Sequence, residues 1–246
     1  VIKARWTIPN KRQNTNMTPI MQKGLDLYIK KEGEWQYAGV GIPQGIHSTS
    51  TLAENMDTSE KDCILYLPLY DEITHLEIGV SSDAYLKKTK NPFKGKIIVY
   101  GSSITQGASA SRPGLAYPSQ LSRSSGYQFI NMGLSGNGKM ESSVAKMLAE
   151  IKNVDAFILD CIPNPTADEI RDRTIPFVKT IREKYPDIPV IFIQSVFREK
   201  GNVNKTVRHR VNEQNKAIEE QIEKLHKLGY KNLYLIKENH FLGTDH

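Results

Sequence analysis

The stretch Lys96-Ile97-Ile98-Val99-Tyr100-Gly101-Ser102-Ser103-Ile104-Thr105-Gln106-Gly107 decides the fold of the second part of the chain. A short apolar run that ends at a glycine predicts a strand buried on both faces of a sheet. The two glycines predict a tight turn after this strand. A serine in such a turn lies at the edge where open α/β sheets bind ligands, so Ser103 is a candidate nucleophile. The alternative is that these serines only cap a helix or complete a turn, as most loop serines do.

Four further apolar runs, at 128–131, 156–160, 190–194 and 233–236, alternate with segments of helical periodicity. One helix is predicted over 140–151, and a second begins at a capping box formed by Thr166 and Glu169. Pro176 is expected to kink or split this second helix. A long charged helix follows, with Gly229 as its C-terminal cap. Strands that alternate with helices predict a flavodoxin-like α/β fold: a parallel five-stranded sheet with helices on both faces.

The first part of the chain has the alternating pattern of half-buried strands instead. Alternation over 25–30, a turn at 32–34 and a return over 35–40 predict a β-hairpin, and 63–67 and 76–80 predict two more strands. Several short strands separated by turns are typical of an antiparallel β-sandwich. We therefore expect a jelly-roll-like sandwich domain at 1–92 and an α/β domain at 93–246, with the polar, lysine-bearing segment 82–93 at the boundary.

The composition excludes several classes of function. The chain has 246 residues and a formal charge of +6, and no apolar run approaches the length of a membrane span. The lysine run at 87–90 has no interleaved aromatic residues, which argues against nucleic-acid binding. No cluster has metal-ligand spacing and no phosphate loop is present, so we expect neither a metal nor a cofactor. Cys63 and Cys161 are expected to be free, buried thiols, because they fall in different predicted domains.

Polar residues follow the first three predicted parallel strands. Ser103 follows the first, the segment Asn131-Met132-Gly133-Leu134-Ser135-Gly136-Asn137-Gly138 follows the second, and Cys161-Ile162-Pro163-Asn164-Pro165 follows the third. Because the carboxyl ends of parallel strands meet at one edge of the sheet, these segments are expected to meet there.

These motifs resemble the sequence blocks of the SGNH (GDSL-type) hydrolases, and the resemblance spans 94–246. It implies that Ser103 is the nucleophile and that Gly136 and Asn164 donate to the oxyanion. The sequence departs from the family at Ser102, where the family usually has aspartate. It departs again at Ile162-Pro163-Asn164-Pro165, where Gly-x-Asn-Asp is usual, so this third match depends on Asn164 and its place after a strand.

The stretch Lys23-Gly24-Leu25-Asp26-Leu27-Tyr28 resembles the Gly-x-Asp-Leu-Tyr motif of a β-sandwich domain that precedes certain SGNH hydrolases. That subgroup is similar to bacterial carbohydrate esterases, including acetyl-xylan-type enzymes. The resemblance implies a serine esterase that removes acyl groups, acetyl above all, from a glycan or a small-molecule ester. An extracellular or periplasmic location follows from this substrate class alone.

A serine hydroxyl needs a base, and the family supplies one from a C-terminal Asp-x-x-His block that the sequence does not contain. Three explanations remain open. The sequence stops before the block, or the adjacent pair Asp245 and His246 serves despite its spacing, or another histidine is the base. The other histidines are His47, His75, His209, His226 and His240.

The alternative function is a carbohydrate-binding protein without catalysis. Trp6, Trp35, Tyr37 and Tyr66 would then form a sugar-stacking face on the sandwich, although aromatic residues in strands more often pack in a core or on a sheet face. The sequence gives no indication of the oligomeric state.

Overall fold

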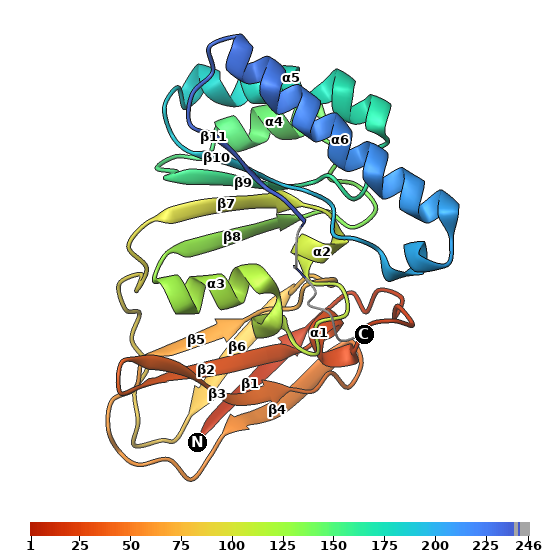
Figure 1. The fold of residues 1–246 in the computed structure, drawn as a ribbon. Coiled ribbons are helices and arrows are strands. Elements are labelled where there is room, and N and C mark those ends of the chain that lie inside the picture. The colour runs from red at the N-terminus through yellow and green to blue at the C-terminus, as the bar shows by residue number, and fades with distance from the viewer. Residues whose placement is uncertain (239–240, 242–246) are drawn as a thin grey trace. The chain divides into compact units, whose positions relative to one another are not determined.

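The computed structural model describes residues 1–238 and 241, which divide into two compact units (Figure 1). The first unit comprises residues 1–94 and 107–126, and the second comprises 95–106 and the chain from 127 onward. The α/β segment therefore contributes residues 107–126 to the first unit. The division into domains at residues 92 and 93 stays a prediction.

The first unit contains two antiparallel three-stranded sheets. One sheet has the order β4-β1-β6 and the other β3-β2-β5. Their bounds are β1 Ile2–Thr7, β2 Leu25–Lys31, β3 Glu34–Gly41, β4 His47–Ala53, β5 Cys63–Tyr66 and β6 His75–Val80. The hairpin of β2 and β3 turns at Glu32 and Gly33, both with positive φ, as the sequence predicts. Apolar side chains of both sheets, among them Ala4, Leu25 and Leu52, pack into one core.

Three short helical segments complete the first unit. Their bounds are α1 Pro19–Lys23, η1 Pro113–Leu115 and α3 Tyr117–Ser125. Side chains of β2 alternate between the core and the opposite face, so Asp26 and Tyr28 face away from the core of Leu25 and Leu27. That outer face receives the segment 107–126.

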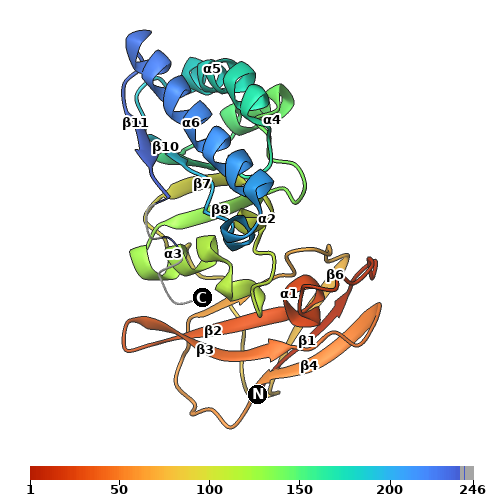
Figure 2. The same ribbon diagram turned by 45° about the vertical axis from the view of Figure 1, so that its right-hand side comes forward.

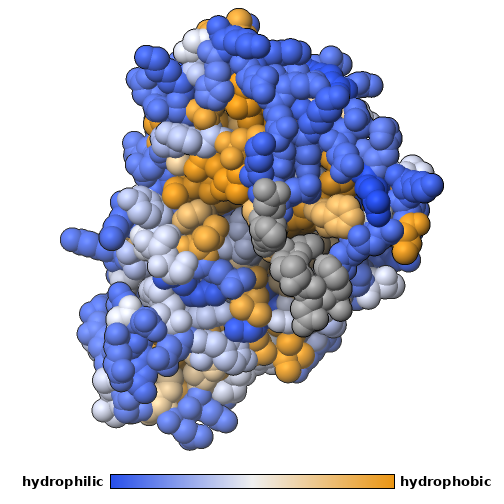
Figure 3. Space-filling model, viewed as in Figure 1, coloured by the Kyte–Doolittle hydropathy of each residue, from blue (hydrophilic) through white to orange (hydrophobic). Residues whose placement is uncertain are grey.

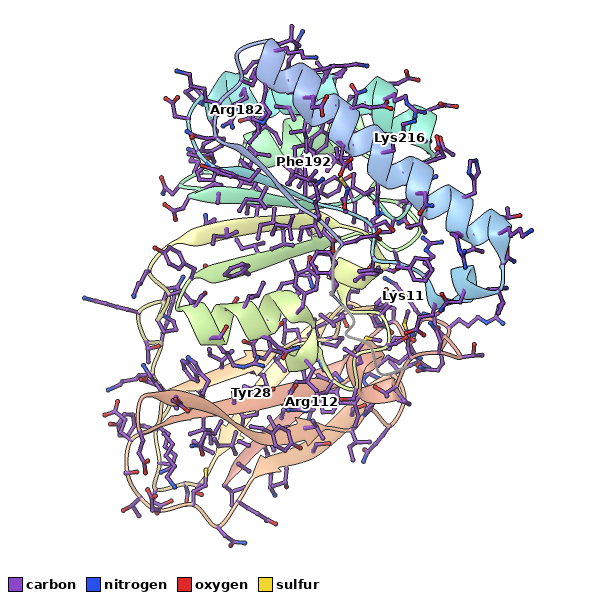
Figure 4. The ribbon with its side chains drawn as sticks, in the orientation of Figure 1. Lys11, Tyr28, Arg112, Arg182, Phe192 and Lys216 are labelled. Atoms are coloured by element: carbon purple, nitrogen blue, oxygen red, sulfur yellow. The ribbon has the colours of Figure 1, made fainter. Side chains whose placement is uncertain are left out.

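Asp26 is the buried centre of this packing. Its carboxylate accepts a hydrogen bond from the backbone N–H of Gly114 at 2.8 Å and pairs with the Arg112 guanidinium at 3.1 Å. Arg112 also donates to the Tyr28 hydroxyl at 3.0 Å (Figure 4). Its guanidinium carbon lies over the Tyr37 ring, 4.3 Å from the ring centroid. A Cβ on Gly114 would approach Tyr28 Cε2 to 2.4 Å, so this contact requires glycine.

Trp6 corrects one expectation from the sequence. Its side chain is completely buried in the sandwich core, and its Nε1 donates to the carbonyl of Lys23 at 3.0 Å. It therefore cannot belong to a sugar-stacking face.

The expectation that both thiols are buried is wrong for Cys63, whose side chain is exposed, and right for Cys161. Both thiols are free, as expected.

The second unit contains a parallel five-stranded sheet with the order β11-β10-β9-β7-β8, which confirms the predicted flavodoxin-like class of sheet (Figure 1 and Figure 2). The strands are β7 Lys96–Gly101, β8 Gln128–Gly133, β9 Ala156–Asp160, β10 Val190–Ile193 and β11 Leu233–Ile236. The helical segments are α2 Ser103–Gln106, α4 Ser142–Ala149, α5 Ala167–Lys184, η2 Glu199–Asn202 and α6 Lys205–Lys227. One core joins the sheet to α4, α5 and α6, with Tyr100, Phe157 and Phe192 among its largest side chains.

The ends of the long helices follow the sequence signals. Thr166 and Glu169 form the predicted capping box at the start of α5. Pro176 does not split α5, which continues through it. Because proline has no N–H, one carbonyl in the preceding turn loses its helical donor, and this is least costly on the exposed side of the helix, where Pro176 lies. Gly229 follows the end of α6 with a φ of +88°, and its N–H donates to the carbonyl of His226.

Within the described residues, none of the helices combines the length and the apolar character needed to cross a membrane. The solvent-facing side of α6 is strongly hydrophilic (Figure 3).

Candidate active site

The first of the three predicted loops begins where β7 ends. Ser102 is buried, and its hydroxyl accepts a hydrogen bond from the N–H of Ile104 at 3.2 Å, so it caps the short helix α2. Ser103 is the first residue of that helix and is half-buried. Among the described residues, its hydroxyl has no hydrogen-bond partner. Aspartate and serine are both good caps, which accounts for Ser102 at a position where an aspartate is usual.

Two buried residues that the sequence analysis did not single out attach α2 to the neighbouring strand β9. Thr105 donates from its hydroxyl to the Asp160 carboxylate at 2.7 Å, and both side chains are buried. A Cβ on Gly101 would lie 2.0 Å from Thr105 Oγ1 and 2.5 Å from the Asp160 carbonyl. Glycine at the end of β7 is therefore necessary for this close packing. In the sequence, an acidic residue at the end of an apolar strand, Asp160, is the signal that could have indicated the contact between α2 and β9.

The strand β8 holds α2 from the other side. A Cβ on Gly133 would lie 2.1 Å from the backbone nitrogen of Gln106, so helix and strand are in direct backbone contact. The Gln106 carbonyl accepts from Asn131 Nδ2 at 3.3 Å, and its side-chain oxygen accepts from the N–H of Ser135 at 2.8 Å. These contacts fix the helix that carries Ser103.

Gly136 lies in the second loop, at the turn in which the N–H of Asn137 donates to the carbonyl of Leu134. Its φ of +74° is in the region that favours glycine, it is exposed, and a Cβ there would meet no atom within 4 Å. Two residues later, Gly138 packs against the backbone of the first loop, where a Cβ would lie 2.3 Å from the Gly101 carbonyl.

Asn164 lies in the third loop, after β9, and is half-buried. Its side-chain amide donates to the carbonyl of Asn137, the residue next to Gly136. The third loop therefore touches the second through the side chain predicted for the site.

The sheet register explains why the three loops meet. Gly101 at the end of β7 pairs with Gly133 at the end of β8 and with Asp160 at the end of β9. All three loops thus leave the sheet at the same level. The structure brings Ser103, Gly136 and Asn164 to one edge of the sheet, as the sequence predicts.

Two arginines and a glutamine hold the backbone of the third loop. The carbonyl of Pro163 accepts from Arg198 at 2.7 Å and from Gln214 at 3.2 Å. The carbonyl of Pro165 accepts from Gln214 at 2.5 Å, and that of Asn164 accepts from Arg210 at 3.2 Å. Burial, reinforced by the charge of Arg210, lowers the pKa of Arg198.

The described residues do not contain the family's acid–base block. His209 and His226 are exposed on α6, and His47 and His75 are exposed in the first unit. His240, Asp245 and His246 lie outside the described residues. Burial and the neighbouring Asp160 raise the pKa of the Cys161 thiol, so this cysteine is not a competing nucleophile.

Within residues 1–238 and 241, no three histidine, cysteine or acidic side chains gather in a way that could hold a metal ion. The arrangement at the end of β7 is instead that of a serine hydroxyl beside a glycine turn and a carboxamide. These groups can form a covalent acyl intermediate and stabilise an oxyanion.

Two family models match the chain. The model of the GDSL-like lipase/acylhydrolase family matches residues 94–246, and the model described as the N-terminus of an SGNH-hydrolase-type esterase matches residues 1–86. No curated protein matches the chain.

Several solved structures are similar. A protein from Bacteroides ovatus ATCC 8483 described as a GDSL-like lipase is 64% identical, with a TM-score of 0.97, over 100% of this chain and 72% of the other. A salicylyl-acyltransferase from a tetracycline biosynthetic pathway is 16% identical, with a TM-score of 0.72, over 99% of this chain and 68% of the other. A family two carbohydrate esterase from Clostridium thermocellum is 11% identical, with a TM-score of 0.60, over 99% of this chain and 80% of the other. At these low identities the last two are similar in fold alone.

Proposed function

Because the chain belongs to the GDSL-like lipase/acylhydrolase family, we propose that it is a serine esterase in which Ser103 is the nucleophile. The observation that carries this proposal is the meeting of the loops after β7, β8 and β9, with Ser103 at the start of α2. Of the two adjacent serines, Ser102 caps α2, whereas the hydroxyl of Ser103 has no hydrogen-bond partner among the described residues.

The reaction proceeds in two steps. Ser103 Oγ attacks the ester carbonyl carbon as its proton passes to a base, and the carbonyl oxygen becomes an oxyanion. The C–O bond to the alcohol then breaks, the alcohol takes the proton, and water hydrolyses the acyl-enzyme by the same route. Gly136 N–H, Ser103 N–H and the Asn164 amide donate to the oxyanion.

The base is a histidine outside the described residues. His209 and His226 are exposed on α6, and among the described residues the side chain of neither has a hydrogen bond to the three loops. On this sequence the remaining candidates in the second part of the chain are His240 and His246. The variants H240A and H246A test each of them, because loss of the base removes both activation of the serine and protonation of the leaving alcohol.

The substrate class we propose is an acetyl ester on a carbohydrate. Its support is the Gly-x-Asp-Leu-Tyr stretch of the first unit and the similarity in fold to carbohydrate esterases. An extracellular or periplasmic location follows from this substrate class.

The proposal is tested with 4-nitrophenyl acetate and acetylated xylan, using the wild-type protein, S103A and S102A. We expect S103A to lose turnover on both substrates, whereas S102A loses part of its stability and retains measurable turnover. Wild-type turnover in S103A contradicts the assignment of the nucleophile.

A second candidate function is glycan binding without hydrolysis. Tyr37 is 52% exposed, and Tyr37 and Trp35 pair across the hairpin with Tyr28 and Lys30, on the outer face of sheet β3-β2-β5. Binding of acetylated xylan by S103A that is lost in the variant Y37A, together with no hydrolysis by the wild-type protein, would favour this candidate.

A further inference from the structure

Two guanidinium groups lie beside the loop that carries Asn164. Arg198 precedes η2 and reaches the carbonyl of Pro163, and Arg210 on α6 reaches the carbonyl of Asn164 itself. Because these two carbonyls belong to consecutive residues, the two guanidinium groups lie near one another, and the charge of Arg210 adds to the effect of burial in lowering the pKa of Arg198.

No carboxylate of the described chain compensates these charges. Within residues 1–238 and 241, neither Arg198 nor Arg210 has an acidic oxygen within the 4.0 Å of an ion pair. Arg171 and Arg173, on α5 in the same unit, do pair with acids: Arg171 with Glu220 at 3.1 Å and Arg173 with Glu169 at 2.9 Å. Arg198 and Arg210 are thus not paired with an acid, unlike these two arginines of α5, although Arg182 and Arg208 also bond only to backbone carbonyls among the described residues.

The surrounding segment is cationic as a whole. Residues 198–210 contain one acidic residue, Glu199, and five basic ones: Arg198, Lys200, Lys205, Arg208 and Arg210. The Arg208 guanidinium donates to the backbone carbonyls of Gly201 and Asn202, and it has no acidic partner among the described residues. A half-buried arginine next to a second arginine is unfavourable by itself, so the pair is best stabilised by an anion, which residues 1–238 and 241 do not supply.

We infer that Arg198 and Arg210 form a subsite for a carboxylate of the substrate, so that the preferred ester is on an acidic molecule such as a uronic-acid-bearing glycan. This inference rests on the proposed function, since it places the anion next to the oxyanion donor Asn164. The planar guanidinium of arginine suits a carboxylate, and its remaining N–H groups can donate to one while a single N–H holds the loop.

The alternative is that both arginines only support the loop. In that case their removal weakens the turnover of every ester alike. A subsite for an anion makes a different prediction, because only esters that carry a negative charge lose rate. The ratio of the two rates therefore separates the explanations.

The test compares 4-acetoxybenzoate with its methyl ester, in which the same carboxylate is masked, and measures acetate release. The wild-type protein is expected to have the larger kcat/KM for the anionic ester. The variant R210Q should lower the anionic-to-neutral ratio of kcat/KM by about tenfold, the scale of one charge-assisted contact. R210K should retain most of the preference, and added salt should reduce it.

K216Q is the matched control, because Lys216 is exposed on the same helix and has the same charge (Figure 4). It should leave both rates unchanged. The carboxylate subsite is refuted if the wild-type anionic-to-neutral ratio of kcat/KM is one or less, or if R210Q lowers kcat/KM equally for both esters. Either result leaves the proposed esterase activity unaffected. If the wild-type protein releases acetate from neither ester, the proposed function fails and this inference fails with it. 4-Acetoxybenzenesulfonate shows whether the preference is for a carboxylate or for any anion, and equal preference for the sulfonate overturns the assignment to a carboxylate.

Discussion

The contact between α2 and β8 gives the sharpest prediction about how Ser103 is positioned. A methyl group added at Gly133 would lie 2.1 Å from the Gln106 nitrogen and 2.5 Å from its Cα. Ordinary contacts of a Cβ begin near 3.4 Å, so G133A must push α2 away from the strand by about 1.3 Å. The atoms in the way belong to the backbone, so a change of rotamer cannot relieve the overlap.

A displacement of this size has consequences for both stability and activity. Overpacking by one carbon costs about 1–3 kcal/mol, which lowers Tm by roughly 2–12 °C for a protein of this size. A nucleophile misplaced by about 1 Å loses on the order of a hundredfold in rate. We therefore expect G133A to remain folded below its melting temperature and to lose about a hundredfold in kcat/KM for 4-nitrophenyl acetate.

The control is G79A, because Gly79 lies in β6 of the first unit and a Cβ there meets no atom within 4 Å. Its free energy of unfolding should change by no more than about 1 kcal/mol, and its activity should be that of the wild-type protein. If G133A does not fold, Q106A provides the second measurement, since it removes the side-chain hydrogen bond to Ser135 and leaves the backbone of α2 unchanged. Wild-type activity in folded G133A, or in both variants, would refute the reasoning.

Three further predictions concern the oxyanion donor, the buried ion pair and the thiols. N164A should lower kcat for 4-nitrophenyl acetate by about 10²–10³ with little change in KM, and an unchanged kcat would remove Asn164 from the oxyanion site. R112A leaves the buried Asp26 carboxylate without its cation and should reduce the free energy of unfolding in urea by about 3 kcal/mol. Burial already raises the pKa of Asp26 above 3.8, so folding favours the protonated carboxyl. The stability that this preference contributes is fully present below pH 3.8 and is lost as the pH rises through the raised pKa. This loss should be larger in R112A, and identical pH profiles for the two proteins would contradict it. A thiol reagent should modify the exposed Cys63 in the native protein and reach Cys161 only after unfolding, whereas rapid reaction of both would contradict the burial of Cys161.

The parallel sheet could be predicted because its strands are nearly continuous apolar runs. The runs at 156–160 and 233–236 coincide with β9 and β11. The strand β4, His47–Ala53, gave no such signal, because its sequence His-Ser-Thr-Ser-Thr-Leu-Ala contains one large apolar side chain, Leu52. Its place in the sheet comes from pairing with β1, a long-range contact that local periodicity does not report.

The association of residues 107–126 with the sandwich was equally invisible in the sequence. It depends on the ion pair between Asp26 and Arg112, which are 86 positions apart, and on a glycine that fits against Tyr28. The Asp-Leu-Tyr stretch was recognised as a motif, but its physical role, to bind Arg112 and the backbone of Gly114, needed the structure.

The positions of Ser103, Gly136 and Asn164 could be predicted from the sequence because each follows a strand end, and their catalytic roles stay a prediction. The residues that support these loops could not be predicted. Thr105 and Asp160, which fix α2, and Arg198 and Arg210, which hold the third loop, became evident only from contacts between distant segments.

The central claim is that Ser103 has the reactive hydroxyl, and covalent labelling tests it directly. The full chain is treated with a fluorophosphonate, and the adduct is located by peptide mass spectrometry. We predict one adduct per chain, on Ser103, and none in S103A. An adduct on Ser102 or on a serine elsewhere, in a protein that hydrolyses 4-nitrophenyl acetate, would contradict the account.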